Sequence, residues 1–148
     1  MPLRIVVADD DADYRMIVRY LLASGADGMT LVGEAADGAY ALTLVLRERP
    51  DVLITDVVMP GLNGVELARR VREAVPDTKI ILMSSYTDDA YRLKASSSGA
   101  DAFVSKQVIN SSLLSAIRDL TGRPLSGGSG PHPGAAGATS WPAVPPPN

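Results

Sequence analysis

Short apolar runs alternate with helix-like segments five times along the first 120 residues of the chain. The runs that we predict as strands are residues 5–8, 31–35, 52–55, 79–84 and 102–105. Continuous apolar runs of this length are typical of strands that are buried on both faces of a sheet. This alternation constrains the fold more strongly than any other feature of the sequence.

The segments between the apolar runs carry helix periodicity and stop signals. The predicted helices span residues 13–24, 38–48, 64–74, 88–98 and 111–120. We expect Asp37 and Asn63 to cap the second and third helices, and Asn110 or Ser111 to cap the fifth. Three arginines of the third helix are expected on its solvated face: Arg69, Arg70 and Arg72.

Strict alternation of strands and helices predicts an α/β fold with a parallel sheet that is covered by helices on both faces. Right-handed crossovers leave few topologies, and a doubly wound five-stranded sheet of order 2-1-3-4-5 with five helices is the expected one. In such sheets, ligands bind beyond the carboxyl ends of the strands, where the strand order reverses. The residues that follow the first, third, fourth and fifth strands are therefore the candidates for a functional site.

Composition excludes several classes of site. The chain has no Cys and a single His, which rules out disulfide frameworks, zinc sites with Cys ligands, Cys nucleophiles and sites with several His ligands. A formal charge of −3 does not indicate a nucleic-acid surface. No apolar run approaches the roughly 18 residues of a membrane span. We therefore expect a cytoplasmic protein that binds neither nucleic acid nor membrane.

Composition changes sharply near Thr121. Residues 122–148 hold 7 of the 11 prolines and 6 of the 13 glycines, and they contain no acidic residue. Such a segment cannot bury enough apolar surface to offset the entropy cost of ordering it. We expect one domain over residues 1–121, followed by a disordered tail or linker over residues 122–148.

Acidic residues follow two strands that should be neighbours in the sheet. Asp9 and Asp10 come after the first strand, and Asp56 comes after the third. Three converging carboxylates repel one another unless a cation lies among them, and a site with only oxygen ligands favours Mg²⁺. Ser84 at the end of the fourth strand and Lys106 after the fifth would suit a tetrahedral anion beside the metal. The set predicts a phosphoryl-transfer site.

These residues carry a family resemblance. The motifs are residues 7–10 (VADD), Asp56 with 59–64 (MPGLNG), 83–85 (MSS) and 99–106 (GADAFVSK). In this order and spacing they resemble the response-regulator receiver domain of two-component signalling, from about residue 3 to residue 120. The resemblance implies the receiver form of the flavodoxin-like fold.

The resemblance also implies roles for the acidic residues. Asp56 would be the phosphoacceptor. Asp10, Asp56 and the backbone carbonyl of Val58 would ligate Mg²⁺ directly, and Asp9 would hold the metal through water. The chain would then contain a 4-aspartylphosphate when it is phosphorylated.

The remaining site residues are expected to bind phosphate or respond to it. By resemblance, Lys106 binds the phosphate, Ser84 supplies the switch hydroxyl and Phe103 is the switch aromatic. Val58 and Tyr86 would flank the path of the water that hydrolyses the acyl phosphate. Neither side chain offers an amide or carboxylate to orient that water, so we expect slow loss of the phosphate.

The chain departs from the usual family pattern in two places. Most receivers have Pro after the lysine, usually with a cis peptide bond, whereas Gln107 follows Lys106 here. A cis bond without Pro costs about 3–4 kcal/mol, so we expect a trans bond. The non-Pro residue and the Ser84-Ser85 pair resemble receivers of LuxR-type regulators. Asp11 extends the acidic pair to a triplet, and we expect it to add negative potential without being a ligand.

The expected function is a phosphorylation-dependent signalling switch that catalyses only its own phosphorylation and slow dephosphorylation. Its partners would be a sensor histidine kinase or a phosphotransfer protein, and an unknown output protein. The sequence does not decide whether the phosphorylated chain forms a homodimer. The alternative is the receiver half of a transcription factor whose helix-turn-helix domain is absent from this chain.

Two enzyme or cofactor classes fit poorly. A phosphatase of the haloacid dehalogenase type needs a second Asp two residues after the nucleophile, where this chain has Val58. A flavodoxin needs hydroxyls and amides in the first strand–helix loop, and that loop is acidic here. Both interpretations are therefore rejected.

Overall fold

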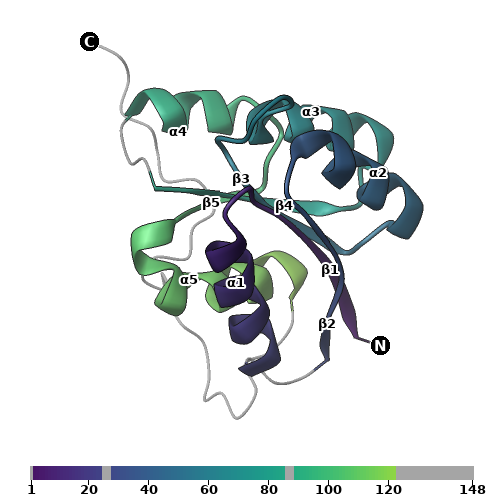
Figure 1. The fold of residues 1–148 in the computed structure, drawn as a ribbon, viewed down its shortest axis with the longest axis vertical. Helices are drawn as coiled ribbons and strands as arrows, with labels where there is room; N and C mark the ends of the chain where they lie inside the picture. Colours follow the sequence, from purple (N-terminus) through teal and green to yellow (C-terminus); the bar gives the residue numbers. More distant parts are fainter. Residues whose placement is uncertain (1, 25–27, 86–88, 123–148) are drawn as a thin grey trace.

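Five parallel strands form one sheet of order β2-β1-β3-β4-β5, which confirms the predicted topology (Figure 1). The computed structural model describes residues 2–24, 28–85 and 89–122. The strands are β1 Leu3–Ala8, β2 Met29–Ala35, β3 Val52–Asp56, β4 Lys79–Ser84 and β5 Ala102–Ser105. The helices are α1 Ala12–Ser24, α2 Gly38–Glu48, α3 Gly64–Ala74, α4 Asp89–Ser96 and α5 Ile109–Thr121, with a 3₁₀ turn η1 at Lys106–Val108. The predicted tail, apart from Gly122, lies outside the described residues.

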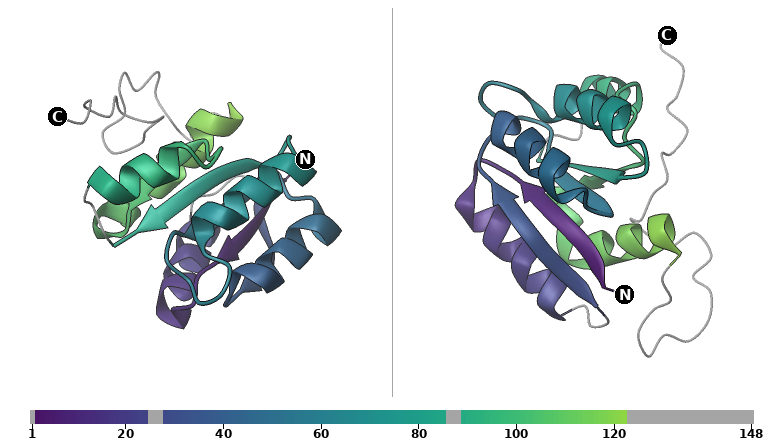
Figure 2. Two further views of the ribbon diagram at one scale, coloured as in Figure 1. Left: turned by 90° about the horizontal axis from the view of Figure 1, so that it is seen from above. Right: turned by 90° about the vertical axis from the view of Figure 1, so that its right-hand side faces the viewer.

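Helices cover both faces of the sheet. Helices α1 and α5 lie on one face, and α2, α3 and α4 lie on the other (Figures 1 and 2). Alternate strand residues enter two separate cores: Val6 packs with the α2–α3 side, whereas Ile5 and Val7 pack with the α1–α5 side. Continuous apolar runs are explained by this burial on both faces. Across the described part of the chain, the helices are too short and polar to cross a bilayer.

The predicted ends of α2 and α3 agree with the structure. The side chain of Asp37 accepts a hydrogen bond from the backbone N–H of Tyr40 at 2.8 Å. The side chain of Asn63 does the same for Glu66 at 2.9 Å. Both residues cap free N–H groups in the first helical turn, as expected from the sequence.

The predicted start of α5 is wrong. The helix begins at Ile109 rather than Ser111, directly after the 3₁₀ turn. Val108 occupies the N-cap position without a side-chain hydrogen bond, and Ser111 lies inside the helix with its hydroxyl donating to the Val108 carbonyl at 3.1 Å. Neither Asn110 nor Ser111 is needed as a cap, because the 3₁₀ turn carries the chain from β5 straight into the helix.

The arginines of α3 divide into two groups. Arg69 and Arg70 pair with Glu66 on the exposed face, as predicted. The prediction for Arg72 is wrong, because its side chain is only 28% exposed and binds residues beyond the end of the helix. It donates to three backbone carbonyls and pairs with one carboxylate: Gly99 at 3.0 Å, Pro76 at 2.7 Å, Thr78 at 3.2 Å and Asp101.

The loop after β3 is held against the strand end by glycines. A Cβ atom added at Gly64 would lie 1.9 Å from the backbone oxygen of Asp56, so no larger residue fits without a backbone shift. The N–H of Gly64 also donates to the Val57 carbonyl at 2.9 Å. Gly61 turns the loop with a φ of 72°, which favours glycine. The loop therefore returns closely past Asp56 before α3 begins.

Candidate functional site

Three carboxylates meet at the carboxyl edge of the sheet. Asp9 directly follows β1 and Asp56 ends β3, and these strands are paired through Ala8 and Thr55. Carboxylate oxygens of Asp9, Asp10 and Asp56 all lie within 4.8 Å of one another. Asp9 and Asp56 are buried, whereas Asp10 is exposed to solvent. The predicted convergence is confirmed.

Lys106 enters this cluster from the start of η1. Its Nζ atom lies 2.6 Å from Asp9 Oδ2 and 3.1 Å from Asp56 Oδ2, and its side chain is 4% exposed. The same atom lies 4.0 Å from the ring centroid of Tyr14, a residue of α1 that sequence reasoning did not single out. No peptide bond among the described residues is cis, so the expected trans Lys106–Gln107 bond is confirmed.

The buried charges shift one another's protonation. Burial raises the pKa of Asp56 to about 6, and the Asp9 charge adds to this rise although the Lys106 ammonium opposes it. Burial acts to lower the pKa of Lys106, but the two carboxylates outweigh it and raise that pKa above its ordinary value. The cluster thus favours a charged lysine beside a carboxyl group that holds its proton more tightly than usual.

The donor set fits a hard divalent cation. The buried Oδ2 of Asp9 contacts the Lys106 ammonium at 2.6 Å and accepts no further hydrogen bond among the described residues. The Lys106 ammonium pairs with the buried Asp9 and Asp56, and a carboxylate oxygen of Asp10 lies within 4.8 Å of theirs. Oxygen-only ligands with a solvent-exposed member at Asp10 suit Mg²⁺, which retains several waters.

A hydrogen-bond network fixes the backbone around Asp9. Its Oδ1 accepts from the N–H of Asp11 at 2.9 Å, and its backbone carbonyl accepts from Arg15 at 2.6 Å. Asp11 in turn accepts from the N–H of Asp13 at 2.9 Å, so its carboxylate caps the first turn of α1. Asp11 is outside the set of converging carboxylates, and this capping role was missed in the sequence.

The other predicted residues lie at or near the same edge. Ser84 is buried at the end of β4 and is paired with Ser105, the residue before Lys106. Phe103 of β5 is 5% exposed and belongs to the core on the α2–α3 side. Val58 is 43% exposed, two residues after Asp56. Tyr86 lies outside the described residues, so its predicted place beside the phosphate path stays a prediction.

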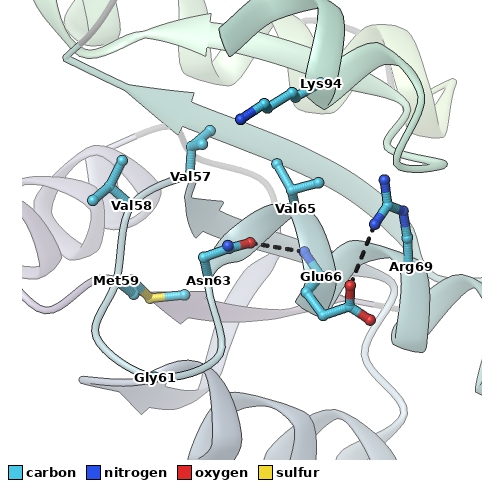
Figure 3. Close-up of a pocket in the computed structure, with 9 residues that line it drawn as sticks. All are labelled: Val57, Val58, Met59, Gly61, Asn63, Val65, Glu66, Arg69 and Lys94. Atoms are coloured by element: carbon cyan, nitrogen blue, oxygen red, sulfur yellow. Dashed lines mark hydrogen bonds and ion pairs between the residues drawn. The ribbon is translucent and has the colours of Figure 1, made fainter.

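A groove of about 550 Å³ flanks the loop after β3 (Figure 3). Its apolar wall consists of Val57, Val58, Met59 and Val65. Glu66 and Arg69 of α3 lie on one side of it, and Lys94 of α4 lies on the other. None of the three clustered carboxylates lines this groove, although Val57 and Val58 directly follow Asp56 in the chain.

Comparisons with known proteins agree with this geometry. Residues 5–118 match the response regulator receiver domain family. The oxygen regulatory protein NreC of Staphylococcus carnosus is 37% identical over 119 residues, which cover 80% of this chain and 54% of that protein. This chain spans about half the length of the curated relatives it matches.

Solved structures give the same result. The signal receiver domain of NarL from Mycobacterium tuberculosis is 34% identical, with a TM-score of 0.77 over 82% of this chain and 98% of that one. A LuxR-family two-component response regulator from Aurantimonas sp. SI85-9A1 is 31% identical, with a TM-score of 0.76 over 83% of this chain and 88% of that one.

Receiver domains are in general switches rather than enzymes, and sensor histidine kinases phosphorylate those of this kind. They bind Mg²⁺ in an acidic pocket, and the cluster of Asp9, Asp10 and Asp56 is the corresponding feature here. From the match over residues 5–118, the shared fold and this acidic edge, we conclude that the chain belongs to the response-regulator receiver domain family of two-component signalling, with LuxR-type regulators among its relatives.

Proposed function

We propose that Asp56 accepts a phosphoryl group from the phosphohistidine of a sensor kinase or a phosphotransfer protein. The observation that carries this proposal is the place of Lys106, whose Nζ atom lies between Asp9 Oδ2 at 2.6 Å and Asp56 Oδ2 at 3.1 Å. A cation beside a carboxylate at the carboxyl edge of the sheet provides both a nucleophile and a group that binds the transferred phosphoryl oxygens.

The metal ligands follow from likeness to the family. Asp10, Asp56 and the backbone carbonyl of Val58 would hold Mg²⁺ directly, and Asp9 would hold it through water. When bound, Mg²⁺ neutralises part of the negative charge on the carboxylates and the incoming phosphoryl group. The proximity of the three carboxylates supports this set.

In the transfer step, a carboxylate oxygen of Asp56 attacks phosphorus while the phosphorus–nitrogen bond of the donor breaks. The electron pair of that bond stays on the histidine nitrogen, and the product on this chain is an acyl phosphate. The Lys106 ammonium and the Ser84 hydroxyl would donate hydrogen bonds to the phosphoryl oxygens. With a pKa of about 6, the Asp56 carboxyl is largely ionised at neutral pH and can act as the nucleophile.

The switch follows from the change in partners at Lys106. In the described state its ammonium contacts Asp56 directly. A phosphoryl group on Asp56 would replace that contact and draw the Ser84 hydroxyl toward it. Phe103 lies on the neighbouring strand β5, and its rotation would repack the face made by α4, β5 and α5. An output protein that reads this face would sense the phosphorylation state.

A transcription-factor half is the second candidate from the sequence. The matched segment of this chain covers about half of each curated relative, and some of these relatives are named transcriptional regulatory proteins. Both candidates contain the same receiver, so the phosphorylation switch is common to them and is the function we propose. Reading the native coding sequence beyond Asn148 separates the two.

Intact mass spectrometry tests the phosphoacceptor. The chain is incubated with Mg²⁺ and acetyl phosphate or phosphoramidate, and we expect a gain of the mass of one phosphoryl group. Asp56→Asn should gain none, whereas Asp77→Asn, an exposed aspartate after α3, should behave as the wild type. Labelling of Asp56→Asn to the wild-type level would overturn the assignment.

A further inference from the structure

The ring of Tyr14 lies against the ammonium group of Lys106. The Nζ atom is 4.0 Å from the ring centroid, well inside the roughly 6 Å at which the face of an aromatic ring attracts a cation. Tyr14 is half-buried, and the Lys106 side chain is 4% exposed. The ammonium therefore contacts the Asp9 carboxylate, the Asp56 carboxylate and an aromatic face.

The position of Tyr14 is fixed by the start of α1. Asp11 caps the first turn through the N–H of Asp13, and the Asp9 side chain holds the N–H of Asp11. One residue beyond Tyr14, Arg15 donates to the Asp9 backbone carbonyl. One direct hydrogen bond from Arg15 and a relay through Asp11 thus connect the first turn of α1 to Asp9, and the ring lies at the Lys106 side of the cluster.

An aromatic face suits this place for a physical reason. Lysine has a flexible four-carbon stem, and a phosphoryl group must take over one of its carboxylate contacts during the switch. A third carboxylate or carbonyl would compete with the phosphoryl oxygens for the ammonium protons. A ring attracts the charge through its quadrupole and leaves strong hydrogen bonds for the phosphoryl oxygens.

We propose that Tyr14 is a positioning residue that holds the Lys106 ammonium where it meets the phosphoryl group on Asp56. This role rests on the proposed function of Asp56 and Lys106, and it adds a residue of α1 to the site. It acts through Lys106 and has no contact of its own with the phosphoryl group.

The contact itself can be tested without phosphoryl chemistry. The chain contains three lysines, at positions 79, 94 and 106, so selectively labelled lysine gives a simple NMR spectrum. The Lys106→Met variant assigns the Lys106 signals by their loss. We expect ring-current upfield shifts of the Lys106 side-chain protons in the wild type and in Tyr14→Phe, and their absence in Tyr14→Leu.

The positioning role is tested with beryllofluoride, a phosphomimetic, in the presence of Mg²⁺. Calorimetry should show that Tyr14→Leu binds it about twofold to thirtyfold more weakly than the wild type, as expected for loss of a cation–π contact. Tyr14→Phe should bind within about twofold of the wild type, because it keeps the ring. The matched control is Tyr20→Leu, the same change at a 72% exposed tyrosine of the same helix, which should have no effect.

The outcomes separate this inference from the proposed function. Unshifted Lys106 protons in the wild type would overturn the contact, whatever the protein does with phosphate. Shifted protons combined with unchanged beryllofluoride affinity in Tyr14→Leu would overturn the positioning role. Failure of the wild type to bind beryllofluoride with Mg²⁺ would overturn the function of Asp56 and with it the role given to Tyr14. If Tyr14→Leu does not fold, Tyr14→Met replaces it in the same comparison. Melting curves check that every variant is folded.

Discussion

The two ends of the sheet each hold a cluster of charged groups, but the clusters are built differently. At the carboxyl edge, three carboxylates lie close together, and the Lys106 ammonium pairs with two of them, Asp9 and Asp56. At the amino edge, Arg72 pairs with Asp101 and donates to three backbone carbonyls as well. Asp101 also accepts from the N–H of Ile80 at 2.8 Å, where β4 begins.

We therefore interpret the amino-edge cluster as a structural site and the carboxyl-edge cluster as a ligand-binding site. The hydrogen bonds of Arg72 join the end of α3 to the loops before β4 and β5, so the amino-edge cluster stabilises the fold. The carboxyl-edge cluster has excess negative charge, which costs stability unless a further cation is bound. Changes at the two edges should therefore affect different properties.

The largest effect on stability is expected at the amino edge. Arg72→Ala should lower the free energy of unfolding by about 2–3 kcal/mol, because it leaves Asp101 and three carbonyls without their charged donor. Denaturant unfolding measures this change. Arg70→Ala, on the same helix with an exposed ion pair to Glu66, is the control and should change stability by about 0.5 kcal/mol or less. Equal stability of the two variants would show that the network of Arg72 adds nothing.

Mg²⁺ should act on the carboxyl edge alone. At ten times its dissociation constant, the metal should stabilise the wild type by about 1.4 kcal/mol through mass action. Asp10→Asn should be more stable than the wild type without metal and should lose most of the response to Mg²⁺. Melting curves at constant ionic strength, with Ca²⁺ in parallel and Asp77→Asn as control, measure this. A wild-type melting temperature that is the same with and without Mg²⁺ would contradict the expected metal site.

The lifetime of the acyl phosphate tests the two residues that we expect to flank the path of the hydrolytic water at the carboxyl edge. The exposed valine at position 58 cannot orient a water, and Tyr86 is the second residue that we predict beside its path. The double variant Val58→Asn with Tyr86→Glu should lose phosphate about threefold to tenfold faster, which corresponds to at most about 1.4 kcal/mol of barrier. The decay is timed after removal of the donor. An unchanged or longer lifetime in a folded double variant would exclude these residues as the gate.

The carboxyl edge should also give the stability a pH dependence in EDTA. The folded-state pKa of Asp56, about 6, lies above its value of 3.8 in the absence of the fold. Between these two values the folded chain binds more protons than the unfolded chain, so this group's contribution falls as pH rises from about 4 to about 6. Unfolding of Asp56→Asn should lack that part of the pH dependence. Identical pH profiles for the two proteins would contradict the raised pKa.

Features set by nearby residues could be predicted from the sequence. The bounds of α2 and α3 and the caps Asp37 and Asn63 agree because a cap acts within one helical turn. Asp9, Asp56 and Lys106 were found for a different reason. Residues at the carboxyl ends of parallel strands meet at one edge once the strand order is known. Their roles in phosphoryl transfer stay predictions.

Other features depend on contacts between elements that are distant in the sequence. Arg72 finds its partner 29 residues away, and Tyr14 meets Lys106 only because α1 and η1 lie at the same edge of the sheet. The start of α5 depends on how the chain leaves β5 through a 3₁₀ turn.

The sequence by itself determined the order of strands and helices, because apolar runs and helix caps are patterns of neighbouring residues. It also determined the place of the acidic edge, because the carboxyl ends of parallel strands meet at one edge of the sheet. Only the tertiary structure decided which charged side chains pair with one another and where negative charge remains in excess. That balance depends on long side chains that reach across the fold, and no spacing along the sequence encodes their reach.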